Sequence, residues 1–222
     1  MTHGRERRMS HGRERRTTHG GERRTTNGRE RPMTGTRTRG TDTDPGELLE
    51  RSLAYALGSV AGVEGVSPGR HTPCPGWDLG ALLGHLDDAL DALYEGLTGG
   101  VIGPFPGAPE AAACGFRRRA CAVLGAWAAG APERVAVGDR ALPSRVMVAV
   151  GAVEIAVHGW DVGQAGGRPV PLPVPLAAEL LPVARQVVAD ADRGVRFAAP
   201  LAVPPSAGAD ERLLAFLGRR SG

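Results

Sequence analysis

The stretch MVAVGAVEIAVHGWDV, residues 147–162, is apolar on nearly every side, yet it carries ionisable side chains in its middle. A helix that is apolar on all sides is typical of the protein core, so we expect this stretch to form the most buried helix. Glu154 and His158 lie four residues apart, so on a helix their side chains lie one turn apart on the same face. Burying a carboxylate alone is costly. Glu154 therefore needs a cation, a partner or a proton.

Helical periodicity extends from Asp44 to the C-terminal stretch and predicts a mainly α-helical fold. Asp44 precedes Pro45, a pair typical of a helix start, and Asp78 is placed to cap a second helix. We expect an antiparallel four-helix bundle with a short C-terminal extension that can add a strand and a helix. The expected helices span residues 46–62, 78–97, 109–130, 143–165 and 175–193, with a short strand at 134–137 and a short helix opening near Asp210.

The second expected helix carries an apolar stripe that would face the core. The stripe consists of Leu79, Leu82, Leu83, Leu86, Leu90, Leu93, Tyr94 and Leu97. His85 lies just outside this stripe, on the side away from Asp87 and Asp91. Small alanines surround it there, which would let another helix approach closely. We therefore expect its imidazole to point into a seam between helices.

Two imidazoles and one carboxylate would then be available inside the bundle, from His85, Glu154 and His158. This set suits Zn²⁺ with an open coordination position, and it suits Fe²⁺ or Ni²⁺ as well. One ligand from one helix and a pair four residues apart from another is a sound geometry in a bundle. The alternative is an ion pair between Glu154 and His158, with His85 an unrelated core histidine. Spacing and burial leave both interpretations open.

The chain divides into an N-terminal tail, residues 1–43, and a helical domain, residues 44–222. Residues 1–32 repeat an eight-residue unit (MTHGRERR, MSHGRERR, TTHGGERR, TTNGRERP) that is rich in Arg and nearly free of apolar residues. This composition predicts disorder. An alternative is that the native protein starts at Met33 and lacks the repeat.

Charge and cysteine content exclude several functions. Residues 1–40 carry 12 Arg and 4 Glu, whereas the remainder carries 15 Arg and 20 acidic residues, so the domain is mildly acidic and lacks the basic face that nucleic-acid binding requires. The sequence contains no run of 18 apolar residues, so we expect no membrane-spanning helix, and no signal peptide is visible. Three cysteines are too few for a disulfide scaffold, so we expect a cytoplasmic protein.

Two stretches resemble a known family. TPCPGWDLGALLGHL (72–86) and VEIAVHGWDVGQAGG (153–167) are similar to the two signature stretches of the mycothiol-dependent maleylpyruvate isomerase-like family, within the DinB superfamily of metal-binding four-helix bundles. DERLLAFLGRR (210–220) resembles the usual C-terminus of its short actinobacterial members. The resemblance implies a metal held by His85, Glu154 and His158. The full-length isomerase of this family also uses an Arg from a distinct C-terminal domain, and the resemblance assigns no residue of this chain to that role.

The resemblance further implies a thiol-using transferase or isomerase, with zinc, nickel or iron as the metal and mycothiol as the thiol. We expect a small electrophilic substrate, no nucleic acid or membrane partner, and a monomer or homodimer. The alternative is a non-catalytic metal-binding or small-molecule-binding protein of the same fold. A zinc-dependent anti-sigma module and a zinc protease are set aside, because no C-x-x-C and no H-E-x-x-H occurs.

A few further residues are candidates for supporting roles. Asp161 could orient a metal ligand, or it could make a helix-end hydrogen bond. Trp77 and Trp160 could line the pocket, although we expect core packing. Cys74, near the start of the His85 helix, could be a reactive thiol, but we interpret it as a small buried residue in a turn fixed by prolines. Cys114 and Cys121 are expected in the core of the third helix.

Overall fold

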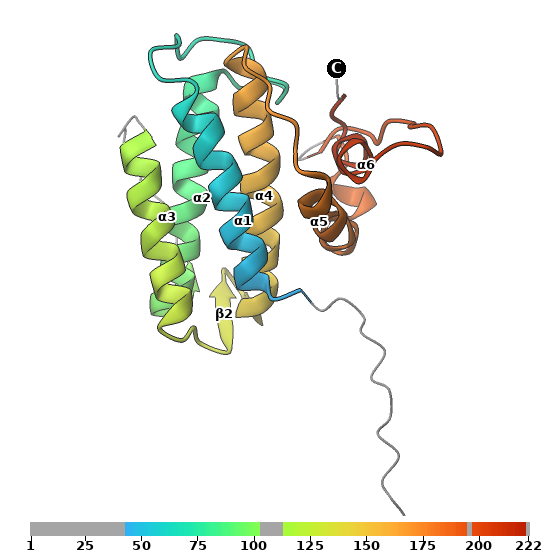
Figure 1. Cartoon of the computed structure of the whole chain (residues 1–222). Helices are drawn as coiled ribbons and strands as arrows, with labels where there is room; N and C mark the ends of the chain where they lie inside the picture. Colours follow the sequence, from blue (N-terminus) through green and yellow to red (C-terminus); the bar gives the residue numbers. More distant parts are fainter. Residues whose placement is uncertain (1–42, 103–112, 195–196, 221–222) are drawn as a thin grey trace, which may run out of the picture. The chain divides into compact units, whose positions relative to one another are not determined.

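The computed structural model describes residues 43–102, 113–194 and 197–220, within a compact unit that spans Thr41–Gly222. The predicted disorder of the N-terminal repeat, and the alternative start at Met33, fall outside the described residues. Four long helices lie side by side (Figure 1) and confirm a mainly α-helical bundle. They are α1 (Pro45–Ala61), α2 (Leu79–Gly99), α3 (Ala113–Ala128) and α4 (Ser144–Ala165).

Two helices of the bundle run each way. The chain ascends in α1 and α4 and descends in α2 and α3 in the view of Figure 1. A small sheet lies where α2 and α3 end and α4 begins, and its order is β1–β2–β3. Its strands are β1 (Val101–Ile102), β2 (Arg134–Val137) and β3 (Arg140–Pro143). β1 and β2 pair in parallel, and β2 and β3 pair antiparallel. β2 confirms the expected strand, whereas its two partners were not expected.

Local signals at the helix starts are confirmed only in part. The Asp78 carboxylate accepts a hydrogen bond of 2.8 Å from the backbone N–H of Ala81, as a capping residue should. Asp44 occupies the N-cap position of α1, but its side chain makes no capping hydrogen bond. The leucine stripe of α2 faces the core, with Leu82, Leu86 and Leu90 fully buried, whereas Tyr94 at its edge is exposed.

α4 is the central helix of the bundle. It packs along α1 and also contacts α2 and α5. Glycines permit these close approaches: a Cβ at Gly159 would lie 2.8 Å from the Cα of Ala56, and one at Gly151 would lie 2.8 Å from a methyl group of Leu93. α4 is long and apolar enough to cross a membrane by length and composition, but 78% of its most apolar window is buried within the bundle. Its apolar composition is thus that of a core helix.

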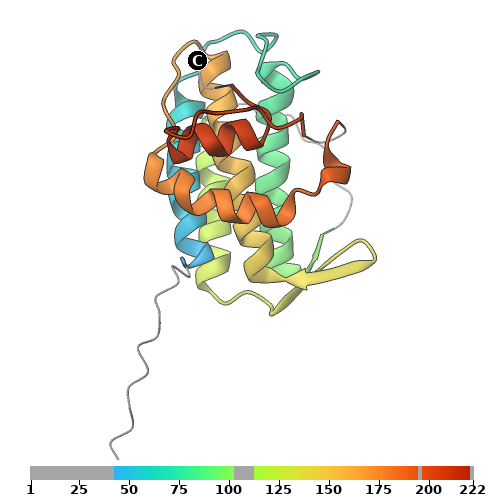
Figure 2. The same cartoon turned by 90° about the vertical axis from the view of Figure 1, so that its right-hand side faces the viewer.

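The C-terminal extension is helical. α5 (Val174–Val187) packs against α1 and α4, a 3₁₀ turn follows at Asp190–Asp192, and α6 (Ala209–Phe216) packs on α5 (Figure 2). α5 ends earlier than expected, and α6 confirms the predicted short helix. The extension contributes no strand in its described residues, only an isolated bridge between Arg193 and Phe197. Of the two elements that the extension could add, the described residues thus contain the helix, and the sheet of the domain precedes α4.

Candidate metal centre

The seam between α2 and α4 brings the three predicted ligands together. His85 Nε2 lies 2.7 Å from Glu154 Oε1, and His158 Nε2 lies 3.2 Å from the same oxygen. The two imidazole rings meet edge to face, with their centroids 5.0 Å apart. α2 supplies His85, and one turn of α4 supplies the other two side chains. The expectation that His85 faces a helix seam is therefore confirmed.

The group is open on one side and closed on the other. The side chains of His85 and Glu154 are each 32% exposed, whereas that of His158 is only 9% exposed. A small molecule could therefore approach from the side of His85 and Glu154. An open position beside three protein ligands is the arrangement of catalytic rather than structural zinc sites.

The pKa values of Glu154 and His158 are both strongly shifted. Burial alone would raise the pKa of Glu154, but hydrogen bonds and charge from His158 and His85 lower it far below its usual range. Burial would likewise lower the pKa of His158, yet its hydrogen bonds to Asp161 and Glu154 raise it to about 9. Without a metal, a proton on His158 supplies the positive charge that ionised Glu154 requires. The donor set fits a divalent cation, since two imidazole nitrogens converge on one carboxylate oxygen.

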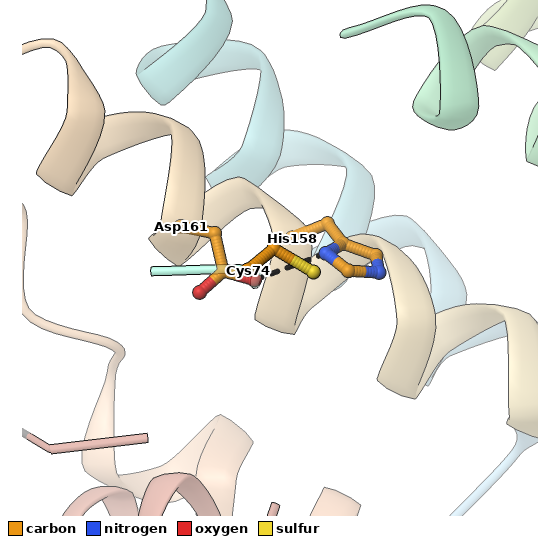
Figure 3. A group of neighbouring side chains, drawn as sticks. All are labelled: Cys74, His158 and Asp161. Carbon is orange, nitrogen blue, oxygen red and sulfur yellow. Dashed lines mark hydrogen bonds and ion pairs between the residues drawn. The ribbon is translucent and has the colours of Figure 1, made fainter. Parts of the chain in front are cut away.

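The other nitrogen of His158 is held by Asp161. Nδ1 lies 3.0 Å from Asp161 Oδ2, and the carboxylate is completely buried (Figure 3). An ionised carboxylate can only accept, so Nδ1 carries the hydrogen of this bond. In the neutral imidazole Nε2 then holds the free lone pair, which is the form that a metal binds. The predicted orienting role of Asp161 is consistent with this contact.

Asp161 has a second partner that the sequence analysis did not assign. Arg219, just after α6, places Nε 3.1 Å from both carboxylate oxygens and Nη2 2.7 Å from Oδ2. The available signal was the presence of Asp161 in the most apolar helix, which demands a cation. The sequence could not indicate which of many arginines supplies that cation.

Cys74 also lies close to His158 and Asp161 (Figure 3). Within the described residues, these three side chains form a second group with ligand atoms all within 4.8 Å of one another. Burial and the charge of Asp161 raise the pKa of the Cys74 thiol, which keeps it protonated and a weak ligand. The guanidinium of Arg219 lies 4.0 Å from the sulfur. A cation already balances this second group, so the open group is the better metal site.

The two tryptophans lie in different places. Trp160 is buried in the core, as expected. Trp77 is 36% exposed, and its ring centroid lies 4.6 Å from that of His85 and 5.9 Å from that of His158. Trp77 therefore forms a wall of the candidate site rather than part of the core.

The cysteines of α3 differ from the expectation. Cys114 and Cys121 are both exposed and free, so the expectation that they belong to the core was wrong. They lie seven residues apart on the face of α3 that Phe116, Ala120 and Val123 leave to solvent.

The family model for the mycothiol maleylpyruvate isomerase N-terminal domain matches residues 49–163. No curated protein and no solved structure matches. The matched residues include His85, Glu154, His158 and Asp161, and they end before α5 and Arg219. With half of its length matched and this group of side chains in place, the chain belongs to the mycothiol maleylpyruvate isomerase N-terminal domain family.

Proposed function

We propose that the chain is a metal-dependent, thiol-using transferase or isomerase. It activates a low-molecular-weight thiol at His85, Glu154 and His158 for attack on a small electrophilic substrate. The observation that carries this proposal is the convergence of both Nε2 atoms on Glu154 Oε1, with one side of the group open. The family match supports a mycothiol-related domain, and mycothiol is the thiol we propose.

Zinc is the proposed metal, with nickel and iron as alternatives that the same donor set would accept. The charges of the site favour one further anion. Glu154 and Asp161 each contribute one negative charge and Arg219 one positive charge, while a ligating histidine is neutral. A divalent ion would leave a net charge of +1, which one thiolate would neutralise.

A metal bound at this site supplies Lewis acidity, which lowers the pKa of a thiol and keeps it as thiolate near neutral pH. His85, Glu154 and His158 hold the ion, and Asp161 retains the proton on Nδ1 of His158. Trp77 shields one side of the group from water. The thiol proton passes to solvent, and a sulfur electron pair forms a bond to an electrophilic carbon of the substrate. In a transferase, the leaving group on that carbon departs with the electron pair of its bond. In an isomerase, the attack opens a carbon–carbon double bond of the substrate, and its electron pair moves onto a conjugated acceptor oxygen. After rotation about the resulting single bond, this pair returns, re-forms the double bond and expels the same thiolate.

A reducing compartment fits this chemistry. Cys74, Cys114 and Cys121 are all free, and a thiol cosubstrate must itself stay reduced. We therefore propose a cytoplasmic protein that acts as a monomer or homodimer on small molecules, without nucleic-acid or membrane partners. The complete absence of lysine agrees with a GC-rich actinobacterial source.

A conjugation assay tests the proposal. Zinc-loaded protein is mixed with mycothiol and an electrophile such as monobromobimane or 1-chloro-2,4-dinitrobenzene, with glutathione as a comparison thiol. We expect Glu154→Ala to lose conjugation together with the metal. Glu50→Ala, which removes an exposed carboxylate of α1, is the matched control and should keep both.

Two outcomes would contradict a thiol-using enzyme. Full activity of a metal-free Glu154→Ala protein would show that the site is not involved. Tight binding of thiol or electrophile by zinc-loaded protein, without turnover of any pair, would favour the non-catalytic binding protein of the same fold.

A further inference from the structure

The chain after α6 makes a sharp turn that directs Arg219 back to the bundle. The N–H of Gly218 bonds to Ala215 O at 3.0 Å, and the N–H of Arg219 bonds to Leu214 O at 2.8 Å. This pair of bonds is the Schellman ending of a helix, which requires a left-handed residue, and Gly218 has φ of 78°. A Cβ at Gly218 would also lie 2.5 Å from that of Ala198. Both features fit glycine alone.

The turn delivers a guanidinium that is well held at its target. Arg219 bonds to both oxygens of Asp161, and its Nη1 donates to Leu217 O at 3.0 Å. Its side chain is only 10% exposed, and Asp161 is completely buried. A buried guanidinium with two-pronged bonds fixes a carboxylate in direction as well as in charge.

We infer that Arg219 is a positioning residue for the metal ligand His158. Arg219 holds Asp161 as a fixed acceptor, and Asp161 retains the Nδ1 hydrogen of His158. Nε2 is thereby held on the side of Glu154, where its lone pair would be available to a metal once the imidazole is neutral. Outer partners of this kind set the orientation and basicity of a metal-binding histidine. The inference rests on the proposed metal site. It assigns a role in that site to the C-terminal extension, which lies outside the matched residues 49–163.

Arg219 acts through Asp161 and not on a substrate. Its guanidinium contacts Asp161, Leu217 and Cys74, on the closed side of His158. The open side, at His85 and Glu154, lies beyond the imidazole. A change at Arg219 should therefore alter how firmly the metal is held.

The test compares Arg219→Gln with Arg220→Gln, which removes the same charge from the exposed neighbouring residue. Zinc affinity is measured by competition with a chromophoric chelator. Exchange of the Nδ1 proton of His158 with water is measured by NMR in metal-free protein. We expect Arg219→Gln to weaken zinc binding by about 10- to 100-fold and to speed this exchange, while Arg220→Gln changes neither by more than about twofold. Equal behaviour of the two variants would overturn the inference.

Two further variants test the inference if Arg219→Gln does not fold. Arg219→Lys keeps the charge beside Asp161 but loses the two-pronged bonding, and Gly218→Ala keeps Arg219 but disturbs the turn that aims it. We expect both to bind zinc less tightly than wild type and to show faster exchange of the Nδ1 proton. Wild-type values in both variants would overturn the inference. Absence of zinc binding in wild type, with a slowly exchanging Nδ1 proton, would instead overturn the proposed function and leave the positioning intact.

Discussion

The two sides of the His158 imidazole offer a comparison within one side chain. On the Nε2 side, His85 and Glu154 form a group that is one-third exposed. On the Nδ1 side, Asp161 is completely buried and bonded to Arg219 of the C-terminal extension, and Cys74 beside it is half-buried. Both sides offer three ligand atoms within 4.8 Å, so geometry alone does not distinguish them.

The difference lies in the cation that each side already holds. Arg219 neutralises Asp161 with fixed hydrogen bonds, whereas Glu154 is stabilised by His85 and by protonated His158, whose proton can be given up. A built-in guanidinium cannot leave, but a proton can be exchanged for a metal ion. A candidate metal site is therefore recognised by two features: suitable ligand atoms, and a balancing positive charge that a metal ion can replace.

Removal of the open group should have the largest effect. The triple variant His85→Ala, Glu154→Ala, His158→Ala should lose the metal completely, while wild type binds about one ion per chain, because all three proposed ligands are removed. Metal content by mass spectrometry after loading with zinc checks this. Retention of a stoichiometric ion by the triple variant would move the site elsewhere.

Breaking the buried ion pair between Asp161 and Arg219 should instead lower the free energy of unfolding. Asp161→Ala leaves Arg219 buried without a counter-charge, and breaking such a pair costs about 3–5 kcal/mol of unfolding free energy. Chemical denaturation of metal-free protein measures the loss. Asp91→Ala is the control, because Asp91 is 34% exposed and its partner Arg119 keeps a second carboxylate, Asp87, at 3.7 Å. We expect this variant to lose about 1 kcal/mol or less. If the two variants lost similar amounts of unfolding free energy, the buried Asp161–Arg219 pair would contribute no more to stability than the more exposed Asp91–Arg119 pair, contrary to this prediction.

Lowering the pH should weaken zinc binding at the group of His85, Glu154 and His158. The raised pKa of His158, about 9, means that this imidazole holds a proton at neutral pH in metal-free protein and must release it to bind zinc. Apparent zinc affinity should therefore rise with pH, by up to about tenfold per unit, until pH about 9. Glu154, with its lowered pKa, stays ionised and adds no proton. Competition titrations at several pH values test this, and an affinity that is constant from pH 6 to 8 would contradict it.

Replacement of Cys74 should have the smallest effect. Cys74→Ser removes the sulfur from the closed group but leaves Arg219 and Asp161 in place. We expect unchanged zinc stoichiometry and an affinity within about twofold of wild type, because a thiol with a raised pKa is a poor ligand. The chelator competition used for the other variants measures it. A loss of zinc in this variant would show that the ion binds on the Nδ1 side.

The bundle and the open group were predictable because they depend on patterns within single helices. Glu154 and His158 lie one turn apart on a helix that is apolar all round, and His85 lies beside a regular leucine stripe on another. Such local periodicity determines which face is buried. The wrong expectation for Cys114 and Cys121 arose because α3 has a weaker apolar pattern, which does not fix the face that packs.

The contacts of the closed group were not predictable in the same way. Asp161 and Arg219 are 58 residues apart, and no periodic pattern connects α4 with the turn after α6. The position of Trp77 beside the imidazoles depends on the path of the loop before α2. β1 has only two residues, too few for an alternating pattern to indicate a strand. Each of these features comes from tertiary packing rather than from local sequence.

The most direct test is an anomalous difference map from crystals of the zinc-loaded protein, recorded at the zinc absorption edge. It reports which side of His158 holds the ion. The account predicts one peak within coordinating distance of His85 Nε2, a Glu154 carboxylate oxygen and His158 Nε2, with Nδ1 still bonded to Asp161. A peak between Cys74, Asp161 and Nδ1, with Arg219 displaced, would contradict it.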